Sequence, residues 1–299
     1  MVDFLSIGEC MVEFAREPDG RYGRRFGGDT LNTAVYAARS GVSAGYAMAL
    51  GTDPYSDSIR ALCRAEHVDD GTILTVKGRM PGLYLIETDD HGERSFFYWR
   101  DRAPARELFE LPGHARVTSA MAAARIVYFS GITLSLYSAA GLDTFHDALV
   151  AARAGGTRIA FDGNYRPSGW GGEAANARPV FARFLKLVDI ALPSFDDEVA
   201  LWGDSDQQDT LKRLAGHGIG EIALKNGPAG ALIGDAAGSR AVPVPEWIEP
   251  IDTTAAGDSF GGAYLAARLK GDAPEVAALA GHRMAAHVIR HRGAIVPRA

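Results

Sequence analysis

A turn of small residues leads directly into a helix in the stretch Asp252-Thr253-Thr254-Ala255-Ala256-Gly257-Asp258-Ser259-Phe260-Gly261-Gly262-Ala263-Tyr264. Helix-forming residues continue from Ser259 to Leu269. The first N–H groups of a helix have no acceptor within it, and the helix dipole adds partial positive charge there. Because the side chains at this turn are small, a phosphate can approach the free N–H groups expected at Ala256, Gly257 and Asp258.

The carboxylate of Asp258 supplies a candidate chemistry for this anion site. A carboxylate beside a bound phosphate can take the proton of an attacking hydroxyl. The alternative is that Asp258 only caps the helix, as isolated aspartates at helix starts usually do. The Ala-Ala-Gly run before it and the leading Asp-Thr pair favour the catalytic interpretation. We therefore predict Asp258 as general base, with an anion hole formed by Ala255, Ala256 and Gly257.

Short apolar runs alternate with helical patterns over most of the chain. Strands are expected at residues 2–8, 45–51, 125–130, 157–162, 188–193 and 219–225, and early helices at 29–40 and 55–66. Asp29 or Thr30 can cap the first helix, and Gly41 can end it. This alternation predicts an α/β domain in which helices cover both faces of a mostly parallel sheet.

Two segments interrupt the alternation. Residues 83–87 and 93–100 are rich in Tyr, Phe and Trp and flank a turn at 88–92, and residues 10–26 carry turn signals at Pro18-Asp19-Gly20. We expect a small β-sheet lid made of residues 10–26 and 71–103. The main domain is then residues 1–9, 27–70 and 104–299. A lid of this kind excludes water from a site beneath it.

The composition bounds the location and the partners. The 299 residues are 47% apolar, and the net charge is −6 without a basic stripe, which disfavours nucleic acid and anionic membranes. No apolar run approaches about 18 residues, and no basic region precedes the first one. Cys10 and Cys63 show no metal-binding spacing. We expect a cytoplasmic protein.

Three motifs in the same order resemble those of the ribokinase-like (PfkB) carbohydrate kinases. Residues 252–260 follow a signature that looks like D-T-x-x-A-G-D-x-F. Residues 27–34 resemble the Gly-Gly turn that opens a helix with Asn, and residues 225–230 match K-x-G-x-x-G. The resemblance covers nearly the whole chain. It implies a three-layer α/β/α fold, ATP and Mg²⁺ as cofactors, and a sugar acceptor.

Within that family the closest resemblance is to the keto-deoxygluconate kinases. It is carried by residues 251–260 and by Pro81-Gly82-Leu83-Tyr84, Phe97-Tyr98-Trp99-Arg100, Asp162-Gly163-Asn164-Tyr165-Arg166-Pro167 and Arg292-Gly293-Ala294-Ile295-Val296-Pro297-Arg298. The resemblance implies phosphorylation of 2-keto-3-deoxygluconate at its 6-hydroxyl. A fructokinase or ribokinase-type enzyme is the alternative. The epimer preference and the oligomeric state stay open.

The resemblance also implies roles for individual residues. Substrate contacts are expected from Gly28, Asp29, Thr30, Leu31, Asn32, Tyr84, Tyr98, Trp99, Arg100, Arg166 and Asp258. Nucleotide contacts are expected from Asn164, Arg166, Lys225, Gly227, Gly230, Ala255, Ala256 and Gly257. Ordinary structural roles are the alternatives: a capped helix start at residues 28–32, lid core or a dimer face for the aromatic residues, and a solvated strand end for Lys225.

Two arginines support a sugar acid independently of the resemblance. A planar guanidinium is the natural partner of a carboxylate, which a neutral sugar lacks. Arg100 ends an aromatic strand and Arg166 lies in a turn after another strand, so both are expected near the strand ends where α/β sheets bind ligands. The alternatives are a solvated strand end for Arg100 and a surface ion pair for Arg166.

Departures from the family pattern affect the metal ions and the anion loop. The family's N-x-x-E element reads Phe195-Asp196-Asp197-Glu198 here, so Glu198 is expected only as an outer-shell, water-mediated magnesium partner. Many relatives bind potassium beside an aspartate like Asp252, which makes potassium a further candidate. Ala255 replaces a common Gly and leaves the backbone accessible if its φ is negative.

Two further hypotheses concern another enzyme class and the oligomeric state. Residues 257–261 fit G-x-S-x-G, so an α/β-hydrolase using Ser259 is a remote alternative, but no buried strand is expected directly before it. The aromatic lid strand suggests a homodimer through the lid, or a higher homo-oligomer, because exposed sheet edges are usually covered.

Overall fold

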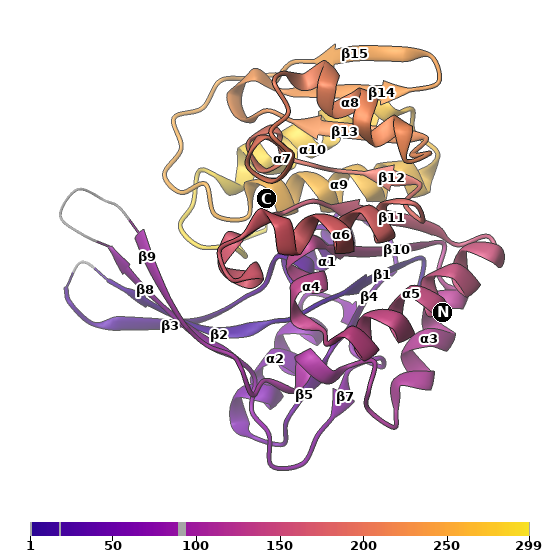
Figure 1. The fold of residues 1–299 in the computed structure, drawn as a ribbon. Coiled ribbons are helices and arrows are strands. Elements are labelled where there is room, and N and C mark those ends of the chain that lie inside the picture. The colour runs from indigo at the N-terminus through magenta and orange to yellow at the C-terminus, as the bar shows by residue number, and fades with distance from the viewer. Residues whose placement is uncertain (1, 18, 89–93, 299) are drawn as a thin grey trace.

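The computed structural model describes residues 2–17, 19–88 and 94–298 (Figure 1). Within these residues a nine-stranded sheet has the order β15-β14-β13-β12-β11-β10-β1-β4-β6. Its parallel strands are β1 (Phe4–Ile7), β4 (Ala44–Ala47), β6 (Val68–Asp69), β10 (Ile126–Ser130), β11 (Arg158–Asp162), β12 (Ile190–Ala191) and β13 (Glu221–Lys225). Strands β14 (Ala231–Asp235) and β15 (Gly238–Val242) add an antiparallel edge.

Helices cover both faces of this sheet. One face carries α1 (Asp29–Arg39), α2 (Pro54–Ala65), α9 (Ala256–Lys270) and α10 (Pro274–Val288). The other face carries α3 (His114–Ala123), α4 (Gly131–Leu136), α5 (Ala139–Ala154), α6 (Ala174–Leu185), α7 (Phe195–Trp202) and α8 (Gln207–Gly216). Short 3₁₀ turns occur at η1 (Pro104–Glu107), η2 (Pro167–Trp170) and η3 (Gly227–Ala229). The predicted three-layer arrangement with a mostly parallel sheet is confirmed.

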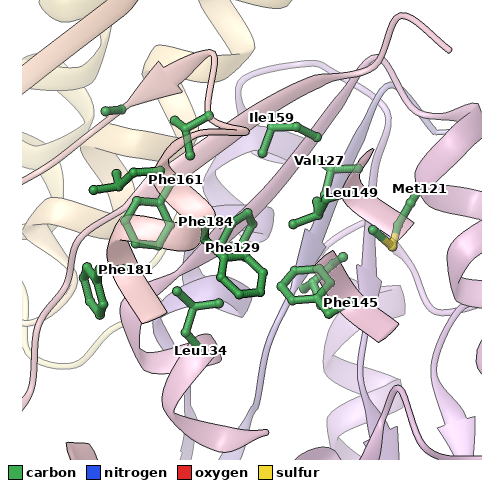
Figure 2. Packing of buried hydrophobic residues seen from close by; sticks show 14 of the residues in the cluster. Met121, Val127, Phe129, Leu134, Phe145, Leu149, Ile159, Phe161, Phe181 and Phe184 are labelled. Atoms are coloured by element: carbon green, nitrogen blue, oxygen red, sulfur yellow. The ribbon is translucent and has the colours of Figure 1, made fainter. Parts of the chain in front are cut away.

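The strands supply both layers of the core because their side chains alternate between the two faces. On β10, Val127 and Phe129 face the α3–α8 layer, whereas Ile126 and Tyr128 face the α1–α9 layer. The ring of Phe129 lies 5.0 Å from that of Phe145 and 5.1 Å from that of Phe161 (Figure 2). Burying side chains of this size stabilises the fold by about 1.5–3 kcal/mol each.

A separate four-stranded sheet projects from the main body, as Figure 1 shows. Its order is β3-β2-β8-β9, and the strands are β2 (Met11–Arg16), β3 (Tyr22–Gly27), β8 (Leu83–Thr88) and β9 (Arg94–Trp99). Strands β8 and β9 pair antiparallel, as expected of a hairpin. Residues 89–92 of the predicted turn, and Pro18 of the other one, lie outside the described residues.

Part of the segment assigned to the lid pairs elsewhere. Strand β7 (Leu74–Thr75) forms a two-stranded parallel sheet with β5 (Ala49–Leu50), which lies in the range expected for the main domain. The exact division of the chain into main domain and lid therefore stays a prediction.

The start of α1 differs from the expectation. Neither Asp29 nor Thr30 caps the helix, because Gly28 occupies the N-cap position and no side chain bonds to the first turn there. A side chain at Gly28 would overlap with the backbone carbonyl of Glu9, so the chain requires glycine at this close approach. Gly41, with φ +81°, follows the end of the helix as predicted.

Candidate active site

Several strand ends and two helix starts meet at one edge of the large sheet. Strand β1 lies between β10 and β4, so the next strands of this sheet, β4 and β6, add to one side of β1, and the later strands from β10 onward add to the other side. Ligands of open α/β sheets bind at such a switch point, outside the carboxyl ends of the strands. The N-termini of α1 and α9 reach this edge, where Asn32 of α1 contacts Asp258 of α9.

Asp258 is the third residue of α9 and is half-buried. The Asn32 side-chain amide donates to its Oδ2 over 2.9 Å. Burial, and after it the charge of Asp29, raise the pKa of Asp258 to about 7 against the opposing hydrogen bond from Asn32. A carboxyl with a pKa near neutrality is well suited to accept a proton at physiological pH.

The anion loop agrees with the sequence analysis in position and differs in two details. Ala255 adopts φ 59° and ψ 17°, so the condition of a negative φ is not met, and the loop holds an alanine in the left-handed region that glycine favours. The Ala256 N–H bonds to the Thr253 carbonyl oxygen over 3.1 Å, so the prediction that it is free is also wrong. Gly257 and Asp258 occupy first-turn positions, whose N–H groups have no acceptor four residues earlier in the helix.

Charged and polar side chains surround Asp258. Lys225 Nζ donates to Asp162 Oδ2 over 2.5 Å, and a Cβ placed on Gly257 would lie 3.3 Å from that Nζ. The Lys225 side chain is only 11% exposed, so its interpretation as a solvated strand end is wrong. Asn164 Nδ2 donates to Asp29 Oδ2 over 2.7 Å, and the Asn164 N–H donates to Asp162. The site thus brings a lysine and three aspartates together.

A cleft of about 670 Å³ opens beside the start of α9. Its lining includes five of the predicted nucleotide contacts: Lys225, Gly227, Gly230, Ala256 and Gly257. The remaining three, Asn164, Arg166 and Ala255, are not among the lining residues. The sequence analysis missed one wall, which consists of residues 244–250 and the face of α10 that carries His282, Ala285, Ala286 and Ile289.

The turn at the start of α1 contributes fewer side chains than predicted. Thr30 and Leu31 are both fully buried in the core, and Thr30 bonds through its Oγ1 to the Tyr46 hydroxyl over 3.0 Å. Their side chains therefore face the core and cannot contact a ligand at this turn, which corrects any side-chain part in the predicted substrate contacts of Thr30 and Leu31. Gly28, Asp29 and Asn32 remain at the site.

The lid places two aromatic side chains on opposite faces of its edge strand. Tyr98 and Trp99 alternate along β9 and are 46% and 60% exposed. The Tyr98 ring lies 5.8 Å from that of Tyr84, whose hydroxyl donates to the buried carboxylate of Glu13. Tyr98 therefore shares the face of the lid that carries Tyr84, and Trp99 lies on the opposite face.

The two predicted carboxylate-binding arginines differ in burial. Arg100 Nη2 donates to Glu9 Oε2 over 2.5 Å, and its side chain is 17% exposed. Arg166 is 54% exposed and pairs with Asp197 over 3.0 Å, so it forms the ion pair named as its alternative role. Burial raises the pKa of Tyr98, and the charges of both arginines oppose that shift. The Arg100 guanidinium lies over the Tyr98 ring, 5.9 Å from its centroid.

Glu198 is held away from the cleft. It is 3% exposed and accepts a hydrogen bond from Arg213 Nη2 over 2.5 Å. Burial raises its pKa to about 7, against the attraction of Arg213. Its carboxylate is thus engaged in an ion pair, whereas Phe195 of the same helix lines the cleft. Among the residues that the structure covers, no group of three or more His, Cys, Asp or Glu side chains could hold a metal ion.

The hydrolase alternative is wrong. Ser259 is fully buried, and its Oγ donates to the Ala256 carbonyl oxygen over 2.9 Å, so it cannot act as an exposed nucleophile. A turn, not a buried strand, precedes α9. Within the described part of the chain, no helix combines the length and apolar character needed to cross a membrane.

Comparisons with known proteins show which proteins this chain resembles. The profile of the pfkB family carbohydrate kinases matches residues 1–299. The 2-dehydro-3-deoxygluconokinase of Escherichia coli K12 is 41% identical over 300 residues, which cover 98% of this chain and 96% of that protein. The solved structure of 2-dehydro-3-deoxygluconokinase from Thermotoga maritima has a TM-score of 0.84 at 20% identity and covers 99% of this chain and 96% of its own. An Escherichia coli protein solved with ATP and Mg²⁺ has a TM-score of 0.85 at 23% identity, with 98% and 94% covered. The two structural likenesses confirm the fold expected from the sequence.

Proposed function

This chain belongs to the pfkB family of carbohydrate kinases, and we propose that it transfers a phosphoryl group from ATP to the 6-hydroxyl of 2-keto-3-deoxygluconate. The products are ADP and 2-keto-3-deoxy-6-phosphogluconate. The observation that carries the proposal is the position of Asp258. Its carboxylate accepts a hydrogen bond from Asn32 of α1, and it directly follows Gly257, which lines the cleft. The 41% identity to the Escherichia coli enzyme supports the choice of acceptor.

Asp258 removes the proton of the acceptor hydroxyl. Its carboxyl is half-ionised near pH 7, because burial and the neighbouring Asp29 raise its pKa. Asn32 bonds to one carboxylate oxygen and leaves the other for the substrate. General-base catalysis of this kind contributes about 10²- to 10⁴-fold to the rate.

The start of α9 and Lys225 stabilise the phosphoryl group as it moves. Negative charge on that group is spread over its equatorial oxygens in the transition state. The first-turn N–H groups of Gly257 and Asp258, the helix dipole and the Lys225 ammonium all favour negative charge at this point. These groups are in place before the reaction, so little reorganisation is required.

Magnesium is proposed to accompany ATP. The ion neutralises charge on the phosphate oxygens when it is bound. Asp162, at the end of β11, would be the carboxylate to contact its water shell, because its partner Lys225 lines the cleft, whereas Glu198 is paired with Arg213 and does not line it. Potassium stays a prediction from the family resemblance, since both oxygens of Asp252 already accept hydrogen bonds, from Thr254 and from Gly293.

The sugar acid is proposed to bind beneath the lid, between the turn at Gly28 and the Arg100 side chain. Arg100 and Arg166 provide guanidinium groups for the substrate carboxylate, and the Arg100 guanidinium lies over the ring of Tyr98 on the lid. A neutral sugar has no carboxylate to accept hydrogen bonds from the N–H groups of Arg100 and Arg166 that their ion pairs with Glu9 and Asp197 do not use. This difference in pairing is the physical reason to prefer a sugar acid over fructose or ribose.

We also propose a homodimer through the lid and a cytoplasmic location. Strand β9 is an edge strand, and Phe96, Phe97, Tyr98 and Trp99 on it are 46–60% exposed. A second copy would cover this surface. The molecular mass in solution tests the homodimer.

The cytoplasmic location is supported by the cysteines. Cys10 and Cys63 are both free and buried, as is usual for a reducing compartment.

An acceptor comparison tests the proposed function. ATP consumption is measured with 2-keto-3-deoxygluconate, fructose, ribose and adenosine, and without any acceptor. The proposal expects the highest kcat/KM with the sugar acid. A higher kcat/KM with a neutral sugar would refute the acceptor assignment, and acceptor-independent ATP consumption would refute the kinase itself.

A further inference from the structure

Glu9 occupies the junction between the main body and the lid. It follows β1 directly, its side chain is 1% exposed, and its Oε2 accepts the hydrogen bond from Arg100 Nη2. Glu9 precedes the first chain segment that enters the lid, and Arg100 begins the last segment that leaves it. The ion pair therefore joins the two ends of the lid.

Two glycines at the other crossings pack against this pair. A Cβ on Gly82 would lie 2.9 Å from Glu9 Oε1 and 3.0 Å from the Arg100 Cβ. A Cβ on Gly28 would overlap with the Glu9 carbonyl oxygen. All four crossings between body and lid thus converge on Glu9 and Arg100. This close packing fixes where the Arg100 side chain begins and in which direction it extends.

The pair is incomplete in a way that points to a ligand. Among the described residues, neither Glu9 Oε1 nor Arg100 Nε has a hydrogen-bond partner, although both atoms are buried. The buried hydroxyl of Tyr137 also has no partner within the described chain. Burial raises the pKa of that hydroxyl, and the charge of Glu9 raises it further. Buried polar groups of native proteins normally have partners.

We infer that Glu9 is a specificity-determining positioning residue, which holds one edge of the Arg100 guanidinium so that its remaining N–H groups face the carboxylate of the acceptor. A guanidinium carries five donors, and Glu9 accepts from one terminal nitrogen only. The guanidinium carbon lies over the Tyr98 ring, 5.9 Å from its centroid. Together they hold a long, flexible side chain in the binding orientation, which lowers the entropy cost of binding.

This inference rests on the proposed function, because it concerns the same acceptor site. A purely structural role for Glu9 is the competing explanation, since a buried ion pair at a hinge also holds the lid in place. The two roles differ in what they affect. A structural role acts on every acceptor and on ATP, whereas positioning of Arg100 acts only on acceptors that carry a carboxylate.

Steady-state kinetics of Glu9→Ala, Glu9→Gln, Arg100→Ala and the Glu9→Ala/Arg100→Ala double variant separate the two roles. We expect Glu9→Ala to raise KM for 2-keto-3-deoxygluconate about tenfold, with kcat, KM for ATP and kcat/KM for fructose nearly unchanged. Glu9→Gln retains an oxygen that accepts from Arg100, so its KM should rise only about threefold. In the Arg100→Ala background, Glu9→Ala should have no further effect on KM.

Glu66→Ala is the matched control, because it removes another largely buried ion pair, that with Arg39, which involves neither Glu9 nor Arg100. It should lower Tm without changing the ratio of kcat/KM for the two acceptors. Equal losses for sugar acid and fructose in Glu9→Ala, or in Glu9→Gln if the alanine variant does not fold, would overturn the inference alone. A wild-type enzyme that prefers fructose would overturn both the inference and the proposed function.

Discussion

The nucleotide half and the acceptor half of this site are built from different kinds of structure. The nucleotide cleft is enclosed by elements of the main body, including β13, α9 and α10, and has a volume of about 670 Å³. The acceptor half forms where the chain passes into a four-stranded lid whose edge strand carries exposed aromatic side chains. Asp258 is on the main body, whereas Arg100 belongs to the lid crossing. Catalysis and acceptor choice should therefore be separable by mutation.

The largest expected effect is that of Asp258→Asn, because Asp258 serves both halves. The amide keeps the shape of the side chain but cannot take a proton. We expect kcat to fall at least about 100-fold with the sugar acid and with any neutral acceptor alike. KM for ATP should change little. A fall of less than about tenfold would remove the assignment of Asp258 as base.

Arg100→Ala should act on the acceptor half alone. The loss of charge-assisted hydrogen bonds to the substrate carboxylate costs about 2 kcal/mol, which corresponds to about a 30-fold lower kcat/KM for the sugar acid. The kcat/KM for fructose should remain within about twofold. Arg183→Ala removes a surface ion pair with Asp143 and serves as control. A similar loss with both acceptors would show that Arg100 only supports the lid.

Trp247→Ala should act on the nucleotide half alone. Trp247 lines the cleft and is 67% exposed, so its ring is available to pack against the adenine base. Losing such a contact costs about 1 kcal/mol, or about a fivefold higher KM for ATP. Trp99→Ala, which removes an exposed tryptophan of the lid, should leave KM for ATP unchanged. The comparison fails if both variants weaken ATP binding equally.

Ala255→Gly should have the smallest effect and should change stability more than activity. Ala255 is held at φ 59°, which costs a non-glycine residue about 1 kcal/mol. Relief of this strain should raise the free energy of unfolding of the glycine variant by about that amount. The greater conformational entropy of glycine in the unfolded chain should offset part of the gain. Ala256→Gly, in the first turn of α9, should instead lower Tm. Destabilisation by both substitutions would contradict the strain at Ala255.

Local patterns in the sequence predicted the parts of the site that lie on single segments. The small-residue turn before α9 indicated the anion loop, and the alternation of short apolar runs with helices indicated the sheet around it. Lys225, Gly227 and Gly230 follow one strand and line the cleft as expected. Each of these features depends on residues close in the chain, which is why periodicity and turn chemistry reveal them.

Features that depend on distant contacts were not predicted. The cleft wall at residues 244–250 has no periodic pattern, and its role follows only from its position opposite α9. Glu9 and Arg100 are 91 positions apart, and their pairing exists only because the lid crossings converge. Thr30 matched the family motif, yet packing directs its side chain into the core. The positive φ of Ala255 is set by the tertiary fold against the preference of alanine.

The pH dependence of kcat/KM tests most directly whether Asp258 is the base that joins the two halves. We predict a limb that rises with pH and has its midpoint near pH 7, because the carboxylate must be ionised and burial raises its pKa. Below the midpoint, kcat/KM should fall about tenfold per pH unit, and the residual activity of Asp258→Asn should lack this limb. The same limb in Asp258→Asn, or a wild-type midpoint near pH 4, would contradict the account.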